Sequence, residues 1–425
     1  PAVAHRRGAP TVAVRAETRR WLIVAALFVV TYGISTPLAA YGVFLPVLAE
    51  QFGWTRGAIS AALSVNLLVG GVAGFAAGAL ADRRGPRALL AATGAMAGVA
   101  FALVSTVSAL WQLYLLVGLL GGVGMSSFYL LTTTTVSHWF DERRGLALAL
   151  VLVGFNLGYI TGGPLAAWLI TRLGWRAAYC ALGGGCGVLI TTAALTVRFP
   201  RPAERAALHR PLPTGSGPAP TTAPHGITLR ESLADPRQWA LNVSWLLLGG
   251  LAIMISVHAV PFARDQGVSL AGASLALTAY GVGSAGGRLL GGALSDRFGT
   301  RLTIGAAYVV EMLALVTLLW IPSRPVLLGS LVAFGAGFAA SDTMVAKVIP
   351  EVFGMRAIGA IMGMLTLGWR CGAALGPAVA GFLYDLTGSY RIPFGVAPLA
   401  VLLSWVLFML ATARRVPGGR RAARA

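Results

Sequence analysis

The sequence predicts an all-α membrane protein with twelve transmembrane helices, arranged as two six-helix bundles related by pseudo-symmetry. Of its 425 residues, 56% are hydrophobic and only 11% are charged, and the mean hydropathy is +0.76. Soluble domains average about 25% charged residues. The charged residues are missing from long apolar runs of roughly the 20 residues that a helix needs to cross a bilayer. The runs therefore predict the helices, and an internal repeat predicts the two bundles.

The apolar runs fall into two sets of six. The first run is longer than the roughly 7–15 residues of a signal-peptide core, so we interpret it as the first span. We expect helices near residues 21–49, 57–80, 87–108, 111–138, 146–171, 176–197, 239–262, 270–294, 302–321, 325–346, 357–384 and 393–412.

A proline-rich break separates the two sets and reads as a flexible linker, with a structured regulatory element as the alternative. The sequence thus divides into an N-terminal tail (1–20), a first bundle (21–197), a linker (198–237), a second bundle (238–413) and a C-terminal tail (414–425).

The basic residues indicate the orientation. Of the 33 lysines and arginines, 25 lie in the two tails, the linker and the loops on the same side, and 6 lie in the opposite loops. The positive-inside rule then places both termini and the linker in the cytoplasm of a multi-pass inner-membrane protein. The net charge of +19 is spread over short clusters, so we expect the lipid bilayer and no nucleic acid as a partner.

Two unrelated landmarks recur at nearly the same interval. Asp82 and Asp296 lie 214 residues apart in similar charged turns, and Pro164 and Pro377 lie 213 residues apart, each after a glycine. A constant interval of this kind indicates a duplicated six-helix unit, as in transporters built from parallel repeats.

Glycines at four-residue spacing predict seams where helices pack closely. They form the four rows Gly70, Gly74, Gly78; Gly154, Gly158, Gly162; Gly283, Gly287, Gly291; and Gly368, Gly372, Gly376.

The two charged turns, GALADRRGPR at 78–87 and GGALSDRFGTR at 291–301, resemble the loop signature of the major facilitator superfamily. The resemblance implies the major facilitator fold and a cytoplasmic gate. Glycines would allow close helix approach or tight turns, and the aspartates would cap a helix or pair with arginine. The implied gate residues are Gly78, Asp82, Arg83, Gly85, Arg87, Gly292, Asp296, Arg297, Gly299 and Arg301.

Two further segments, HWFDERRGLALAL at 138–150 and HAVPFARDQG at 258–267, are similar to segments of monocarboxylate and oxalate/formate transporters. In that branch, the arginine matching Arg288 binds the substrate carboxylate. The resemblance implies a monomeric secondary active transporter of a small organic anion, a monocarboxylate, that works by alternating access with proton coupling. The branch's aspartate one turn before this arginine is Ser284 here, and its lysine in the first span has no counterpart, which puts the coupling mode in question.

Arg288 also stands out without any resemblance. It lies eight residues before Asp296, so a helix places it roughly 12 Å from the turn, near the middle of a roughly 30 Å hydrocarbon core. An unpaired cation there is costly and usually marks a solute pathway. Tyr280 and Ser284 share its helix face. The alternatives are a structural ion pair with Glu311 or Asp342, or an arginine bonded to backbone carbonyls.

Other polar groups at helix depth are weaker candidates, because interhelical hydrogen bonds explain them equally well. A second central cation, Arg370, is a candidate for solute contact. The other candidate contacts are Tyr129, Asn156, Tyr159, Tyr32 and Asn66, and the candidates for proton coupling are His258, Glu311 and Asp342.

The sequence holds no nucleotide loop, metal-ligand spacing or nucleophile–base set, so we expect no enzyme, cofactor or metal. Three alternatives to proton symport stay open: a drug or secondary-metabolite exporter, an organic-anion exchanger and a non-transporting receptor. The exporter is disfavoured because Pro164 is followed by Leu-Ala-Ala-Trp168 and not by the glycines of the drug-antiporter pattern.

Overall fold

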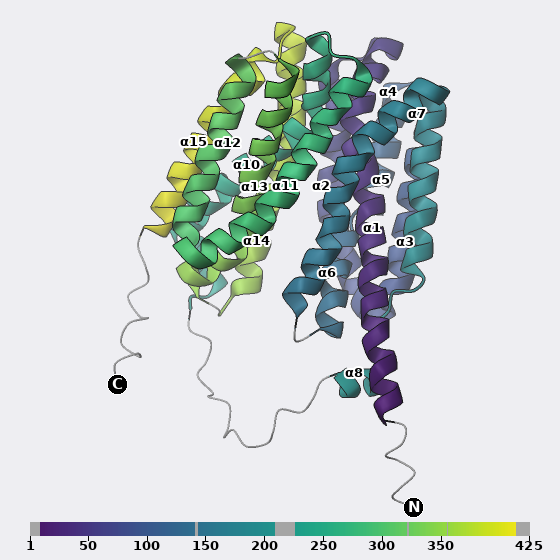
Figure 1. The fold of residues 1–425 in the computed structure, drawn as a ribbon, viewed down its shortest axis with the longest axis vertical. Helices are drawn as coiled ribbons and strands as arrows, with labels where there is room; N and C mark the ends of the chain where they lie inside the picture. Colours follow the sequence, from purple (N-terminus) through teal and green to yellow (C-terminus); the bar gives the residue numbers. More distant parts are fainter. Residues whose placement is uncertain (1–8, 141–142, 209–225, 321–322, 355, 414–425) are drawn as a thin grey trace, which may run out of the picture. The chain divides into compact units, whose positions relative to one another are not determined.

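The computed structural model describes residues 9–140, 143–208, 226–320, 323–354 and 356–413, and these residues are almost entirely helical (Figure 1). The helices of the first half and the linker are α1 (Ala9–Phe52), α2 (Arg56–Arg84), α3 (Pro86–Leu103), α4 (Leu110–Leu113), α5 (Gly121–Gly124), α6 (Phe128–Trp139), α7 (Arg144–Ala194), α8 (Pro202–Leu208) and α9 (Leu229–Ala234). Those of the second half are α10 (Pro236–Asp265), α11 (Leu270–Phe298), α12 (Thr300–Trp320), α13 (Arg324–Phe353), α14 (Ile358–Thr387) and α15 (Arg391–Thr412).

The all-α prediction is confirmed. Among the described residues, nine helical stretches are long and apolar enough to cross a membrane, which is compatible with the twelve predicted spans. The predicted spans five and six run on as α7, which turns at Gly174, where φ is +78°. Span four is built from α4, a π-helical stretch (Tyr114–Leu120), α5 and α6. The φ of +78° at Gly174 suits glycine, which lacks the Cβ that other residues would have to accommodate.

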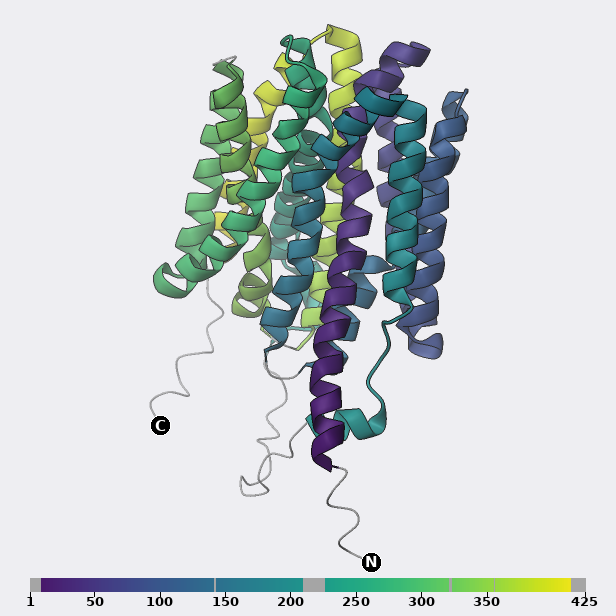
Figure 2. The ribbon, with the colours of Figure 1, turned by 45° about the vertical axis from the view of Figure 1, so that its right-hand side comes forward.

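The N-terminal tail and the linker are more ordered than predicted. The first helix begins at Ala9 and not near residue 21, and Figure 2 shows it as one continuous helix. At the start of the linker, Arg198 donates to both carboxylate oxygens of Glu204, at 2.7 and 2.6 Å, which lowers the pKa of Glu204 to about 2. The prediction of a flexible linker is therefore wrong for α8 and α9, and residues 209–225 lie outside the described part.

The linker returns to the second half through a short backbone contact. Gly226 pairs with Gly354, and the Ile227 N–H donates to Phe353 O at 3.1 Å. Thr228 and Glu231 then form a capping box at the start of α9, which satisfies two N–H groups of that helix.

The chain forms two compact units. Unit 1 comprises Pro1–Ala40 and Val69–Thr221, and unit 2 comprises Tyr41–Leu68 and Thr222–Ala425. The far end of α1 and the first part of α2 thus belong to unit 2, although both helices continue in unit 1. The predicted division into bundles at the linker stays a prediction.

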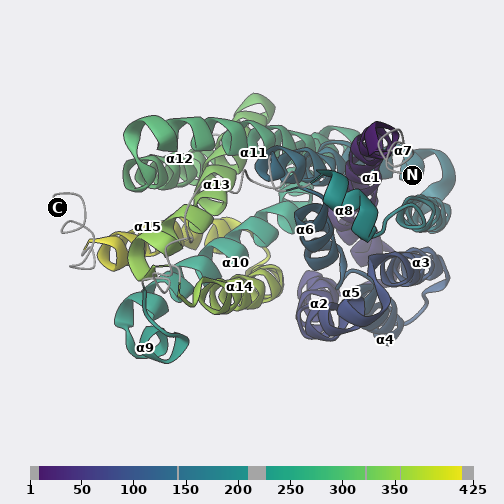
Figure 3. The same ribbon diagram turned by 90° about the horizontal axis from the view of Figure 1, so that it is seen from below.

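The predicted glycine seams are confirmed within each unit at the described glycines, and the surroundings of Gly78 lie outside the described part. A Cβ on Gly154 or Gly162 would meet backbone atoms of α1, and one on Gly283 or Gly287 would meet backbone oxygens of α13. Glycine brings the two backbones of each pair into direct contact. In unit 2 the result is a tight pair of α11 with α13 and a second pair of α10 with α14 (Figure 3).

Replacing Gly372 with alanine is expected to destabilise unit 2. The new Cβ would meet the backbone oxygen and carbon of Leu246 on α10, so the helices have to separate at a cost of about 1–3 kcal/mol. Gly363→Ala on the same helix is the control, since an added Cβ there has open space. Thermal unfolding of the full-length protein in detergent should show a lower Tm for Gly372→Ala only. Equal Tm values would contradict the seam.

Candidate functional site

The candidate site in unit 2 is centred on Arg288. It lies on α11, where Gly283, Gly287 and Gly291 bring α13 close. Arg288 Nη1 donates to Asp342 Oδ2 at 3.2 Å, and Thr343 Oγ1 lies 3.4 Å from the same nitrogen. The close packing of two helices thus places a cation and an anion together inside a membrane-spanning unit.

The expectation of an unpaired Arg288 is wrong, because Asp342 supplies a counter-ion. The sequence analysis named this pair as an alternative beside Glu311 but could not choose it, because Arg288 and Asp342 lie 54 positions apart on different helices. The pair is single, through one nitrogen and one oxygen, and both side chains are partly exposed, at 26% and 29%. Arg288 can therefore form further hydrogen bonds, since a guanidinium carries five N–H donors.

Two donors on the same face of α11 have no partner among the described residues. They are Arg288 Nε and Ser284 Oγ, and both atoms are buried. Ser284 lies one turn before Arg288, so the two side chains are neighbours on the helix. Buried donors without partners are costly, which makes this row suited to a ligand with acceptor oxygens.

Tyr280 lies one turn before Ser284 on the same face of α11, toward the N-terminal end of that helix. Its ring stacks against Phe334 and Phe338 of α13, with centroid distances of 6.1 and 6.5 Å, and its side chain is buried. Tyr280 therefore forms the apolar end of the row.

Arg370 is half-buried on α14, beside Trp369.

Glu311 lies on α12, which packs against α13. It is fully buried, and its Oε1 lies 3.1 Å from Ser341 Oγ, next in sequence to Asp342. Ser341 has one hydroxyl proton, and its oxygen also lies 2.9 Å from Phe338 O. If the serine donates to that carbonyl, the hydrogen bond to Glu311 needs a proton on the carboxyl. Glu311 Oε2 has no described partner, which also fits a neutral carboxyl.

The third candidate for proton coupling, His258, belongs to a different cluster. Its Nδ1 lies 2.9 Å from Tyr390 Oη, and its Nε2 lies 2.8 Å from Pro377 O and 3.3 Å from Ser60 Oγ. The structure therefore groups Asp342 and Glu311 with Arg288 and associates His258 with the beginning of α2.

The candidates of unit 1 are positioned by α1, α6 and α7. Thr161 Oγ1 lies 3.3 Å from Tyr32 Oη, Asn156 and Tyr159 are buried, and the Tyr129 side chain is 51% exposed. Asn66, on α2, is buried in unit 2.

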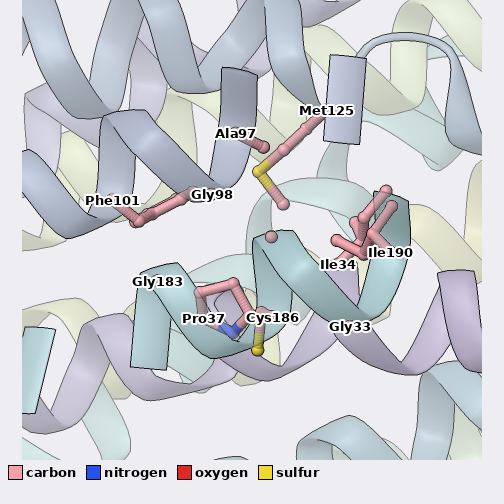
Figure 4. Close-up of a pocket in the computed structure, with 11 residues that line it drawn as sticks. Gly33, Ile34, Pro37, Ala97, Gly98, Phe101, Met125, Gly183, Cys186 and Ile190 are labelled. Carbon is pink, nitrogen blue, oxygen red and sulfur yellow. The ribbon is translucent and has the colours of Figure 1, made fainter. Parts of the chain in front are cut away.

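A pocket in unit 1 is lined by apolar side chains and glycines, with Met125 extending into it (Figure 4). The predicted contact residues do not line this pocket, and its lining lacks a charged group. It therefore does not suit an organic anion.

Each half has a predicted gate glycine directly after a helix, Gly85 after α2 and Gly299 after α11. Their φ values are +76° and +86°, which confirms the expected tight turns. The expectation of close helix contact at Gly292 is wrong, because a Cβ there would meet nothing within 4 Å. The neighbouring Gly291 makes that contact with Ala340 instead.

Asp296 is paired with a lysine and not with an arginine. Lys347 Nζ on α13 donates to Asp296 Oδ1 at 2.6 Å and to Ser295 Oγ at 2.8 Å. Arg297 lies over the Phe298 ring, and Arg301 Nη2 lies 3.4 Å from Met409 O. In the first half, Arg87 is exposed, and the surroundings of Gly78 and the side chains of Asp82 and Arg83 lie outside the part that the structure describes.

The duplicated turns and the two sets of six helices agree with a family comparison. The family model "Major Facilitator Superfamily" matches residues 22–263 and 246–425. The chain belongs to this superfamily. It is a multi-pass membrane transporter and not an enzyme.

Similar proteins support this assignment. This superfamily member is 29% identical to human monocarboxylate transporter 11 over 93% of the chain and 83% of that protein. It is 24% identical to the uncharacterized MFS-type transporter YhjX of Escherichia coli, over 84% and 86% of the two chains. Among solved structures, the nucleoside transporter NupG matches with a TM-score of 0.74 at 12% identity, covering 92% of this chain and 99% of that one.

The sequence also contained a signal for residues that we did not single out. Few charged residues lie on the loops opposite the basic side, and Arg56, Asp265 and Asp385 are among them. In unit 2, Arg56 forms an ion pair with Asp265, and Asp385 accepts the backbone N–H of Arg56.

Proposed function

We propose that the chain is a secondary active transporter of a small organic anion, a monocarboxylate, and that it works by alternating access with proton symport. The observation that carries the proposal is the single, partly exposed contact between Arg288 and Asp342 beside the unsatisfied Arg288 Nε and Ser284 Oγ. The relatives named monocarboxylate transporters point to the same class of solute.

In the proposed cycle, the solute carboxylate replaces Asp342 on Arg288. A planar guanidinium can bind a carboxylate through two parallel hydrogen bonds, which is stronger than the single contact it makes with Asp342. Ser284 is placed to donate to a further solute oxygen. Selectivity for acids thus depends on the arginine fork and its neighbouring hydroxyl.

In this proposal, the released Asp342 carries the coupled proton. A carboxylate that loses its counter-ion inside a membrane protein is costly, and taking a proton from water removes that cost. One proton then enters with each monoanion, and the loaded site carries no additional charge. Asp342 would take the coupling role that the branch gives to an aspartate at the position of Ser284.

We further propose a monomer in the inner cell membrane with both termini in the cytoplasm, because the basic residues lie on that side.

Arg370 could contribute a second positive charge in the same unit, which would favour a dianion and exchange instead of symport.

The test is uptake of labelled lactate, pyruvate, formate and oxalate into proteoliposomes with an imposed pH gradient. Symport predicts accumulation of a monocarboxylate when the outside is acidic, and collapse of that accumulation by a protonophore. An exchanger would instead require an anion inside the vesicles. Absence of uptake for all four acids, together with drug resistance in a pump-deficient host, would overturn the proposal in favour of an exporter.

A further inference from the structure

A charged and aromatic cluster surrounds the first residue of α2. Arg56 Nη1 and Nη2 donate to Asp265 Oδ2 and Oδ1 at 2.8 and 2.7 Å. The Arg56 guanidinium carbon also lies 4.0 Å from the centroid of the Tyr384 ring. A bidentate, charge-assisted pair with a cation–π contact is among the stronger polar arrangements at a protein surface. Asp265 ends α10, and Tyr384 belongs to α14.

The beginning of α2 is capped by a residue of another helix. Asp385 of α14 accepts the N–H of Arg56 at 2.9 Å and the N–H of Gly57 at 2.8 Å. The first N–H groups of a helix lack partners within it, and a negative charge there is favourable. The cap is therefore complete only while α2 and α14 are in contact.

Glycines allow this contact. A Cβ on Gly57 would lie 2.5 Å from Phe382 Cδ1, and a Cβ on Gly381 would lie 2.7 Å from Gly57 Cα. One turn further along α2, Ser60 Oγ lies 3.3 Å from Nε2 of His258, which belongs to α10. Both residues are fully buried. Side chains of α2, α10 and α14 therefore meet beneath Arg56.

We propose that Arg56, Asp265 and Asp385 form a latch that holds residues 41–68 against α10 and α14, and that this latch opens once in each transport cycle. This inference rests on the alternating access of the proposed function. Residues 41–68 belong to α1 and α2, whose remaining residues lie in unit 1, so the latch attaches first-half helices to second-half helices.

The chemistry of the latch suits reversible opening. The side chains of Arg56 and Asp265 are 15% and 32% exposed, so water can solvate both when they separate. A second, weaker pair joins Arg264 of α10 to Glu50 of α1 at 3.5 Å. Two adjacent residues of α10 thus pair with the two first-half helices.

The test measures opening with a cysteine placed beneath the latch. In full-length protein purified in detergent, Ser60→Cys is labelled with a charged thiol reagent, and protein with Ser60 intact gives the background of native cysteines. Adding Arg56→Gln should raise the labelling rate by at least about fivefold, the expected effect of losing a charge-assisted pair. Asp265→Asn should do the same, and the double variant should be no faster than the faster single one, because both changes remove one interaction.

Arg391→Gln is the control, because this exposed arginine begins α15 and lies outside the latch. It should leave the labelling rate unchanged. Hydrogen–deuterium exchange over residues 56–60 reports the same opening without the cysteine, and Arg56→Gln should reduce protection there. Unchanged labelling and unchanged exchange in Arg56→Gln would overturn the latch. Neither readout needs a solute, so failure of the latch is distinct from failure of the uptake experiment.

Discussion

Replacing Arg288 with alanine is expected to abolish saturable uptake of the transported acid, and replacing it with lysine is expected to reduce uptake strongly. Loss of hydrogen bonds to a charged partner costs about 1.5–3 kcal/mol, which is roughly a ten- to hundredfold loss in affinity. Lysine keeps the positive charge and can still pair with Asp342. It lacks the planar fork that binds both carboxylate oxygens. The measurement is the initial rate of uptake against solute concentration in proteoliposomes.

Arg172 provides the matched control, since it is an exposed arginine on α7 in the other unit. Arg172→Ala and Arg172→Lys should transport like the parent protein. If Arg288→Ala and Arg288→Lys carry the acid as fast as the parent does, Arg288 does not bind the solute. A thermal-unfolding curve for each variant separates loss of binding from loss of folding.

Replacing Asp342 with asparagine is expected to uncouple transport from protons. The amide cannot take a proton, so uptake should no longer accumulate the acid in response to a pH gradient. Asparagine also competes less well for Arg288 than a carboxylate does, so solute binding should tighten by a few-fold, within the range of about 0.2–1 kcal/mol for exposed pairs. The measurement is uptake and solute–solute exchange across a series of pH values.

Exchange of labelled for unlabelled solute should persist in Asp342→Asn, because exchange needs no net movement of protons. Asp342→Glu should restore part of the pH dependence. Glu17→Gln is the control, since this carboxylate pairs with Arg20 near the start of α1 and lies in the other unit. Gradient-driven accumulation by Asp342→Asn at the parent's level would show that the proton is carried elsewhere, with Glu311 as the next residue to test.

Much of the fold could be predicted from the sequence because hydrocarbon imposes simple rules. Apolar runs of bilayer length predict helices, and the rows of glycines predict where helices touch, as Gly283 and Gly287 do against α13. The helical extension to Ala9 was missed because residues 9–20 carry charges and polar groups. A polar segment can be helical outside the membrane, as the pairing of Glu17 with Arg20 illustrates.

The site was predicted less completely than the fold. The depth of Arg288 and the row of Tyr280, Ser284 and Arg288 follow from helical spacing within one segment. The contact with Asp342 depends on the rotation and register of α11 against α13, which spacing along one helix does not specify. The same limit applies to Asp385, which caps a helix more than 300 positions away.

Proton uptake during solute binding tests the central claim most directly. Calorimetric titration of the purified protein with the best-transported acid, repeated in buffers of different ionisation enthalpy, gives the number of protons taken up as the complex forms. The account predicts uptake of about one proton in the parent protein and none in Asp342→Asn, with binding lost in Arg288→Ala. Binding without proton uptake in the parent, or unchanged binding in Arg288→Ala, would contradict the exchange of partners on Arg288.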